Sequence, residues 1–241
     1  MALPDRFSHW TKDMWPLRRS LLSVVPAALR DKEDARVEFR RPWETIRFFS
    51  HILESRVVTP HIERSARIHP TAIIDGNVHI GHHVVIHPYA HIVGPVCIAD
   101  RAEIGDHSLV RSSIIGRHCV IGAMSEVVRS TIGHDTTTHH SFVGDSVVAP
   151  WVEITAGDVL TGYNLRGRRI ASLFQGTLEP VDGKFGAIIG AHTSIGMHSG
   201  VLPGTKIGEY CTIYPGSVVS RDVQNGRTVK SESPLTIYPR Q

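Results

Sequence analysis

The run THHSFVGDSVVA, residues 138–149, places two adjacent histidines ahead of an aromatic residue and a Gly-Asp turn. A neutral imidazole can take a proton from an amine or a hydroxyl, because the pKa of an unperturbed histidine is about 6.5. The chain has 16 histidines, and most of them fit solvated corner or outward positions. His139 and His140 differ because they lie where a sequence repeat loses its phase. One of this pair is therefore the candidate general base.

The repeat that must position these histidines has a period of six residues. A period of six fits neither a helix, at 3.6, nor a strand, at 2. It predicts a three-sided solenoid in which three hexads form one coil of about 18 residues. The predicted fold class is an all-β solenoid, a left-handed parallel β-helix with the aliphatic residues inside. The repeated positions are Ile62, Ile68, Ile74, Ile80, Ile86, Ile92, Ile98, Ile104 and Val110, then Ile115, Ile121 and Val127, and later Ile189, Ile195, Val201, Ile207, Ile213 and Val219.

Other segments do not follow the six-residue repeat. Residues 1–60 are predicted to be a helical N-terminal segment, because the run at 41–55 places Trp43, Ile46, Phe49 and Leu53 at helical spacing. The β-helix is expected over residues 61–222, with an extruded insertion loop at 158–188. Loops longer than about 15 residues are usually functional or disordered. Residues 223–241 are predicted to form a polar C-terminal tail.

Composition excludes several classes of function. A formal charge of +3 without a basic block argues against a nucleic-acid partner. The three cysteines are widely spaced and form no CxxC pair, which favours a reduced cytoplasmic location and no metal site. No apolar run approaches the about 20 residues of a membrane span, and the N-terminus does not resemble a signal peptide.

A three-sided column offers little chemistry by itself, because its flat sides have no deep pocket. Sites form where columns pack together, usually in a three-fold ring, and extruded loops roof the cleft. Such a cleft suits a long, thin cofactor with a small acceptor at one end. We therefore expect a homotrimer that transfers an acyl group from coenzyme A, with a histidine base and an amide donor for the tetrahedral intermediate.

Several motifs resemble a known family. The run HHSFVGDSVVAPWVEITAG (139–157) is similar to the acetyltransferase half of the bifunctional sugar-1-phosphate nucleotidyltransferase/glucosamine-1-phosphate N-acetyltransferase family. The runs NLRG (164–167), GKFGAIIGAHTSIG (183–196) and LPGTKIGEYCTIYPGSVVSRDV (202–223) resemble its archaeal-type members. The resemblance covers about residues 41–225 and is to the β-helix half, since nothing here resembles the family's glycine-rich nucleotide loop.

The resemblance implies roles for particular residues. The family's catalytic base falls on His139, and His140 falls on a position that is usually aliphatic. Arg111 aligns with an arginine that contacts the sugar phosphate, and Asn164 aligns with an asparagine of the acceptor site. The implied acceptor-binding residues are Arg111, Arg129, Phe142, Asn164, Arg168 and Lys184. Lys206 and Lys230, near the C-terminal coils, are assigned to the phosphates of acetyl-coenzyme A or another acyl-coenzyme A, and no metal is required.

The sequence differs from the family pattern at positions that the resemblance assigns to acceptor binding. Phe142 replaces a tyrosine, and Val128 replaces a phosphate-binding lysine. Arg129 follows Val128 directly, and strand alternation would send it to the opposite face. Losing polar contacts changes which substrate a site accepts. The implied function is therefore acyl transfer, with acetyl as the expected group, to an amine or hydroxyl of a sugar phosphate or nucleotide-sugar-like acceptor.

Two other functions remain open at the level of sequence. A non-catalytic trimeric scaffold or partner subunit for a separate nucleotidyltransferase is consistent with Phe142 and Val128. A γ-carbonic-anhydrase-like metalloenzyme uses the same solenoid with three histidines across a subunit interface. The sequence has neither the Arg-Gly-Asp turn nor the histidine pair expected of that second class.

Overall fold

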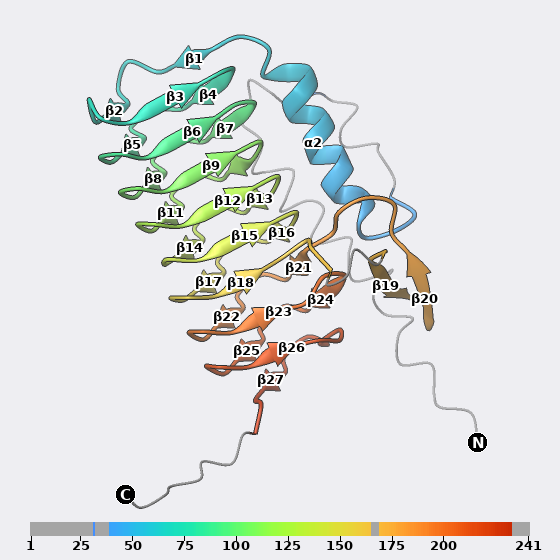
Figure 1. Cartoon of the computed structure of the whole chain (residues 1–241). Helices are drawn as coiled ribbons and strands as arrows, with labels where there is room; N and C mark the ends of the chain where they lie inside the picture. Colours follow the sequence, from blue (N-terminus) through green and yellow to red (C-terminus); the bar gives the residue numbers. More distant parts are fainter. Residues whose placement is uncertain (1–30, 32–38, 165–168, 233–241) are drawn as a thin grey trace, which may run out of the picture.

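The computed structural model describes residues 31, 39–164 and 169–232. Over these residues the chain winds into a column with three parallel sheets as its sides, and one helix lies along one side (Figure 1). Each strand pairs in parallel with the equivalent strand of the next coil, as Ile62 does with Ile80. The predicted parallel β-helix of hexapeptide repeats is confirmed.

We name the three sides sheets A, B and C, in the order in which each coil visits them. Sheet A contains β1 (His61–Ile62), β4 (Val78–Ile80), β7 (Val96–Ile98), β10 (Ile114–Ile115), β13 (Thr131–Ile132), β16 (Val147–Val148), β21 (Ala187–Ile189) and β24 (Thr205–Ile207). Sheet B contains β2 (Arg67–Ile68), β5 (Val85–Ile86), β8 (Glu103–Ile104), β11 (Val120–Ile121), β14 (Thr137–Thr138), β17 (Glu153–Ile154), β22 (Ser194–Ile195), β25 (Thr212–Ile213) and β27 (Thr228–Val229). Sheet C contains β3 (Ile73–Asp75), β6 (His91–Val93), β9 (Leu109–Arg111), β12 (Glu126–Val128), β15 (Phe142–Gly144), β18 (Val159–Leu160), β23 (Gly200–Val201) and β26 (Val218–Val219).

The interior of the column is a stack of aliphatic side chains. Each coil contributes one inward residue per sheet, and in the central coils these residues are essentially inaccessible to solvent. Because a coil cannot bury its inner face alone, the apolar area removed from water couples each coil to the next. The stack of sheet A includes Ile80, Ile98, Ile115, Ile132, Val148 and Ile189.

The break in the repeat is a shortened corner and not a lost strand. Strand β14 keeps its register, and Thr138 takes the inward position between Ile121 and Ile154. Five residues lead from Thr138 to Val143 on the next sheet, where the preceding coil uses six from Ile121 to Val127. The corner between sheets B and C is therefore one residue shorter at the point where it carries the two histidines.

Replacing Thr138 by valine is expected to stabilise the protein by about 1 kcal/mol, because the buried Thr138 hydroxyl has no hydrogen-bond partner. Thr136→Val is the matched control: the Thr136 hydroxyl donates to the Ala149 carbonyl at 3.1 Å and accepts the Val152 amide at 3.3 Å. That variant should lose stability. Urea unfolding of both proteins makes the measurement, and equal shifts would contradict the expectation.

Helix α2 (Glu44–Arg56) covers the outer face of sheet A (Figure 1). Its buried side comprises Phe49, Ile52 and Leu53, and Trp43 packs beside them. The apolar stripe at helical spacing thus packs against the solenoid, as its spacing indicated. The residues of the column that receive the helix include Cys97, Ile114, Val147, Phe185 and Ile188. Sheet A is therefore covered on both faces, whereas sheets B and C are covered only inside.

The insertion leaves the column after Leu160 and returns at Ala187. It carries an antiparallel hairpin, β19 (Ala171–Phe174) and β20 (Thr177–Pro180), which lies beside α2. The column continues past the boundary predicted at 222, because β27 pairs with β25 through Ile213 and Val229. Among the described residues, no helix is long and apolar enough to cross a membrane.

Candidate functional site

His139 lies on the shortened corner between sheets B and C. Its side chain is exposed, and its amide donates to the Ile154 carbonyl at 3.0 Å, which ties the corner to the next coil. The next residue, His140, has a φ of 44°, in the left-handed region. This backbone geometry closes the short corner and leaves the His139 imidazole free to meet a ligand. In the described part of the chain, no group of three or more His, Cys, Asp or Glu side chains could hold a metal ion.

The outer face of sheet C begins at this corner. The Phe142 ring lies across the neighbouring position of its own strand: a Cβ on Gly144 would come within 2.6 Å of the ring. The ring therefore extends along the strand, away from His139 and toward the edge shared with sheet A. Val128, on the adjacent strand, pairs with Gly144 and is buried. The centre of this face is apolar where the resemblance implied polar contacts to the acceptor.

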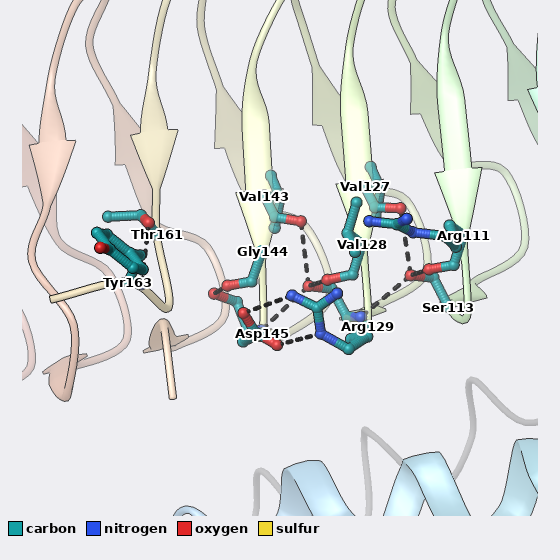
Figure 2. Close-up of polar contacts among 12 residues, drawn as sticks. Arg111, Ser113, Val127, Val128, Arg129, Val143, Gly144, Asp145, Thr161 and Tyr163 are labelled. Atoms are coloured by element: carbon teal, nitrogen blue, oxygen red, sulfur yellow. Dashed lines mark hydrogen bonds and ion pairs between the residues drawn. The ribbon is translucent and has the colours of Figure 1, made fainter. Parts of the chain in front are cut away.

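The opposite edge of sheet C carries the arginines (Figure 2). Arg111 ends β9 and is exposed. Arg129 lies at the corner after β12 with a φ of 48°, and its amide donates to the Arg111 carbonyl at 2.9 Å. The expectation that strand alternation would send Arg129 to the opposite face was wrong, because the left-handed corner ends the alternation there. Both arginines therefore lie along one edge.

Arg129 is held by a carboxylate of the next coil. Its Nε donates to Asp145 Oδ1 at 2.5 Å and its Nη2 to Oδ2 at 2.9 Å, a two-point pairing (Figure 2). The Asp145 side chain is only 7 % exposed, against 36 % for Arg129. The hydrogen bond from Asp145 raises the pKa of Arg129. The pair fixes the guanidinium at the edge of sheet C, with its remaining N–H groups available to a ligand.

Arg129→Ala should lower the free energy of unfolding by about 2 kcal/mol, because it leaves the buried Asp145 carboxylate without its two donors. Arg129→Lys should recover only part of that loss, since an ammonium cannot reproduce the two-point geometry. Chemical denaturation of the three proteins is the measurement. A lysine variant as stable as the wild type would show that the two-point geometry is unimportant.

Two adjoining grooves open beside this edge. The first, of about 680 Å³, lies between α2 and the column and is lined by Arg129, Asp145 and Lys184 among others. The second, of about 350 Å³, is lined by Asn164, Arg169 and Lys184. The structure therefore brings together three of the predicted acceptor-binding residues, Arg129, Asn164 and Lys184. Arg168, also predicted there, lies outside the described residues.

Sequence reasoning missed the contribution of α2 to the first groove. Arg47 lines it and donates through Nη2 to the Asp182 carbonyl of the insertion. These two residues lie 135 positions apart, so no local motif connects them. The signal available in the sequence was the position of Arg47 on the polar side of an amphipathic helix.

The two lysines assigned to a cofactor lie in different environments. Lys206 is 1 % exposed, and its ammonium contacts Asp222 Oδ2 at 2.7 Å, Ser172 Oγ at 2.8 Å and the Leu173 carbonyl at 2.9 Å. An ammonium has three donors, so these contacts leave none for a coenzyme phosphate. Lys230 is exposed at the end of the last described coil. The structure gives Lys206 an internal role and leaves Lys230 accessible.

The site as a whole has two separated parts. His139 occupies the edge between sheets B and C, and Arg111, Arg129 and the two grooves occupy the edge between sheets C and A. The outer face of sheet C lies between them. A base, a row of cations and an open apolar face can serve proton abstraction from an anionic acceptor, provided that the acceptor spans the face or a second chain closes it.

Family models match both halves of the column. The model described as the GMPPB C-terminal domain matches residues 57–160, and the bacterial transferase hexapeptide model of six repeats matches residues 186–221. With the three-sided column, these matches show that the chain carries hexapeptide repeats and a segment similar to the GMPPB C-terminal domain. The chain is similar to the C-terminal acetyltransferase half of bifunctional nucleotidyltransferase/acetyltransferases, as its motifs indicated.

The individual relatives are long, two-part proteins. The bifunctional sugar-1-phosphate nucleotidylyltransferase/acetyltransferase of Sulfurisphaera tokodaii is 34% identical over 205 residues, which is 80% of this chain and 48% of that protein. The bifunctional protein GlmU of Methanococcus vannielii is 27% identical over 202 residues, covering 83% and 48%. The chain thus spans about half the length of these curated relatives. A solved UDP-N-acetylglucosamine acyltransferase from Campylobacter jejuni matches at 18% identity with a TM-score of 0.35, covering 65% of this chain and 68% of that one.

Proposed function

We propose that the protein transfers an acyl group, acetyl in the first instance, from acyl-coenzyme A to an amine or hydroxyl of a sugar phosphate or nucleotide sugar. The observation that carries this proposal is the exposed His139 on a shortened corner, beside the open face of sheet C. The other edge of that face carries Arg111 and Arg129, which suit a phosphate. The name of the Sulfurisphaera tokodaii relative, which includes acetyltransferase, supports the reaction class.

His139 would act as the general base. As the acceptor nitrogen or oxygen attacks the thioester carbon, its proton passes to the imidazole. The new N–C or O–C bond forms, the C–S bond breaks as the tetrahedral intermediate collapses, and the proton returns to the departing thiolate of coenzyme A. The shortened corner supports this role because it leaves the imidazole exposed while the backbone of His139 is held by Ile154.

The acceptor would be bound between two copies of the chain in a homotrimer. Within one chain, His139 and the Arg129–Lys184 groove lie at opposite edges of sheet C. Sheet A is covered by α2, so sheets B and C are the faces left for association. A second copy packed on sheet C would roof the Phe142 face and bring further polar groups to it. This arrangement supplies the cleft that a single column lacks.

The acceptor need not be glucosamine 1-phosphate itself. Phe142 offers no hydroxyl to a substrate, Val128 is buried, and Arg129 is partly engaged by Asp145. A site that lacks hydrogen-bonding groups no longer selects the substrate that needs them. We therefore propose a less polar amino sugar, either phosphorylated or linked to a nucleotide, as the substrate class.

The direct test is thiol release from acetyl-coenzyme A in the presence of a panel of acceptors. The panel contains glucosamine 1-phosphate, deoxygenated amino-sugar phosphates and nucleotide-linked amino sugars. We expect turnover with one of the last two groups and unchanged turnover after treatment with a metal chelator. Loss of all turnover with the chelator would contradict a metal-independent reaction. No turnover with any acceptor, despite a folded oligomer, would contradict the proposal.

A second candidate is a non-catalytic trimeric partner of a separate nucleotidyltransferase. The pairing of Arg129 with Asp145 favours it, because that arginine is already partly neutralised within the chain. Calorimetry with acetyl-coenzyme A separates the two candidates. Heat of binding at micromolar coenzyme supports the enzyme. Absence of binding, together with a stable complex with a nucleotidyltransferase chain, supports the scaffold.

A further inference from the structure

A ladder of small residues lines the inside of the corner between sheets B and C. In this ladder a side-chain oxygen of one coil accepts the backbone N–H of the equivalent residue in the next coil. Ser125 N–H donates to Ser108 Oγ at 3.3 Å, and Ser141 N–H donates to Ser125 Oγ at 3.3 Å. Farther along, Ser217 N–H donates to Ser199 Oγ at 3.3 Å. Serine suits this position because it is small and its hydroxyl also donates to a nearby carbonyl.

Asp158 interrupts this ladder. It replaces serine in the coil between Ser141 and Ser199, and it is 0% exposed. Its Oδ1 accepts the Ser199 N–H at 2.7 Å, as a serine oxygen would. Its Oδ2 has no hydrogen-bond partner in the described structure. The ladder position therefore holds a carboxyl group with one oxygen unsatisfied, although serine fills the same place in the neighbouring coils.

Asp158 lies directly behind the corner that carries His139. The Ser141 hydroxyl, which has one proton to donate, lies 2.7 Å from the His139 carbonyl and 2.9 Å from the Thr155 carbonyl of the next coil. The Asp158 carbonyl accepts the Phe142 N–H at 2.9 Å. These bonds join the segment 139–142 to the segment 155–158. A change in the backbone conformation around Asp158 is therefore expected to change the backbone conformation at His139.

We propose that Asp158 is a positioning residue for His139, and that ionisation of its buried carboxyl group loosens the corner that presents the imidazole. A protonated carboxyl is neutral and tolerates the apolar interior, whereas the carboxylate needs donors for both oxygens and has them for one. The catalytic part of this inference rests on the proposed function, but the structural part does not.

The surroundings of Asp158 are consistent with this behaviour. Burial raises the pKa of Asp158 to about 7, and the hydrogen bond from the Ser199 N–H only partly opposes that rise. The titratable groups around it are few and lie on the outside: His139 and His140 on the preceding coil, His198 on the following coil and Glu153 on its own coil. The His198 ring lies against Gly157, where an added Cβ would come within 2.4 Å of Nδ1.

The pH dependence has a defined sign. The pKa of Asp158 is raised in the folded state, so the folded corner retains a proton that an opened corner releases. The stability of the corner is therefore complete below the pKa of a free aspartate, about 4, and is lost as the pH rises toward about 7. Over that window, opening becomes more favourable by up to about tenfold per pH unit. Above it, the carboxylate remains charged in the closed corner.

Hydrogen exchange of the corner amides tests the structural part. The amides are those of Phe142 and Gly157, which donate to the Asp158 and His140 carbonyls. After correction for intrinsic exchange, protection in the wild type should fall by about tenfold or more between about pH 5 and 7. Asp158→Asn and Asp158→Ser should remove this dependence, and Glu153→Gln should retain it. Asp158→Ser places at this position the residue that the neighbouring coils have. The test can therefore be made with the serine variant if the asparagine variant does not fold.

The pH profile of acyl transfer tests the catalytic part. We expect kcat in the wild type to fall above about pH 7 and Asp158→Asn to lose that alkaline limb, with KM unchanged within twofold. A purely structural role would lower activity equally at all pH values. Equal pH dependence of exchange in the wild type and both Asp158 variants would overturn the inference. Absence of acyl transfer in every protein, with the exchange pattern as expected, would instead refute the proposed function and leave the coupling of Asp158 to the corner established.

Discussion

Replacing His139 by glutamine is expected to lower kcat for acyl transfer by about 10²–10⁴-fold, the usual contribution of general acid–base catalysis. Glutamine retains polar atoms of similar reach but cannot take up a proton. The acceptor and the coenzyme should still bind, because His139 lies at the opposite edge of sheet C from the basic grooves. KM should therefore change little. Steady-state thiol release with the acceptor identified from the panel is the measurement.

His140→Gln is the matched control for this experiment. His140 is also exposed and is adjacent in the chain, and its carbonyl accepts the Gly157 amide at 3.0 Å. Its side chain is not assigned to the reaction, so kcat should stay within about threefold of the wild type. Size-exclusion chromatography shows whether both variants keep the oligomer. A fully active His139→Gln protein, or a larger loss in His140→Gln, would remove His139 from the role of base.

Replacing Lys206 by alanine is expected to lower the free energy of unfolding by about 3–5 kcal/mol, the usual result of removing one partner of a buried ion pair. The carboxylate left behind belongs to Asp222, whose side chain is only 5% exposed. Burial raises the pKa of Asp222, and the attraction of Lys206 opposes that rise. The substitution also removes the donor to Ser172 and Leu173, which fastens the hairpin of the insertion to the column. Chemical unfolding measures the loss.

Two further variants serve as comparisons for Lys206→Ala. Lys230→Ala removes an exposed lysine and should change stability by less than about 0.5 kcal/mol. Lys206→Met combined with Asp222→Leu removes both charges and should recover much of the loss, because an apolar pair of similar volume avoids the desolvation of two ions. If Lys206→Ala were as stable as the wild type, the buried pair would have no structural role, and the earlier assignment of Lys206 to coenzyme binding would regain support.

The sequence alone was sufficient to predict the architecture of the column. A six-residue repeat dictates local geometry, and each coil buries its aliphatic residue only by stacking on its neighbours, so the period determines a parallel β-helix. The stripe of Trp43, Phe49 and Leu53 likewise predicted a helix with one buried side. The position of His139 at an irregular corner was visible as a change of phase. These features depend on residues close together in the chain.

The burial and the interaction partners of the polar residues depend on the tertiary structure. Arg129 points along the edge of sheet C because its corner has a left-handed backbone, and strand alternation does not apply there. Lys206 is buried because Asp222 and Ser172, 16 and 34 residues away, converge on it. Asp158 lies inside the column because its corner stacks on those of adjacent coils. In each case the charge of a side chain is known from its type, but its solvent exposure and its partners depend on segments that meet only when the coils stack.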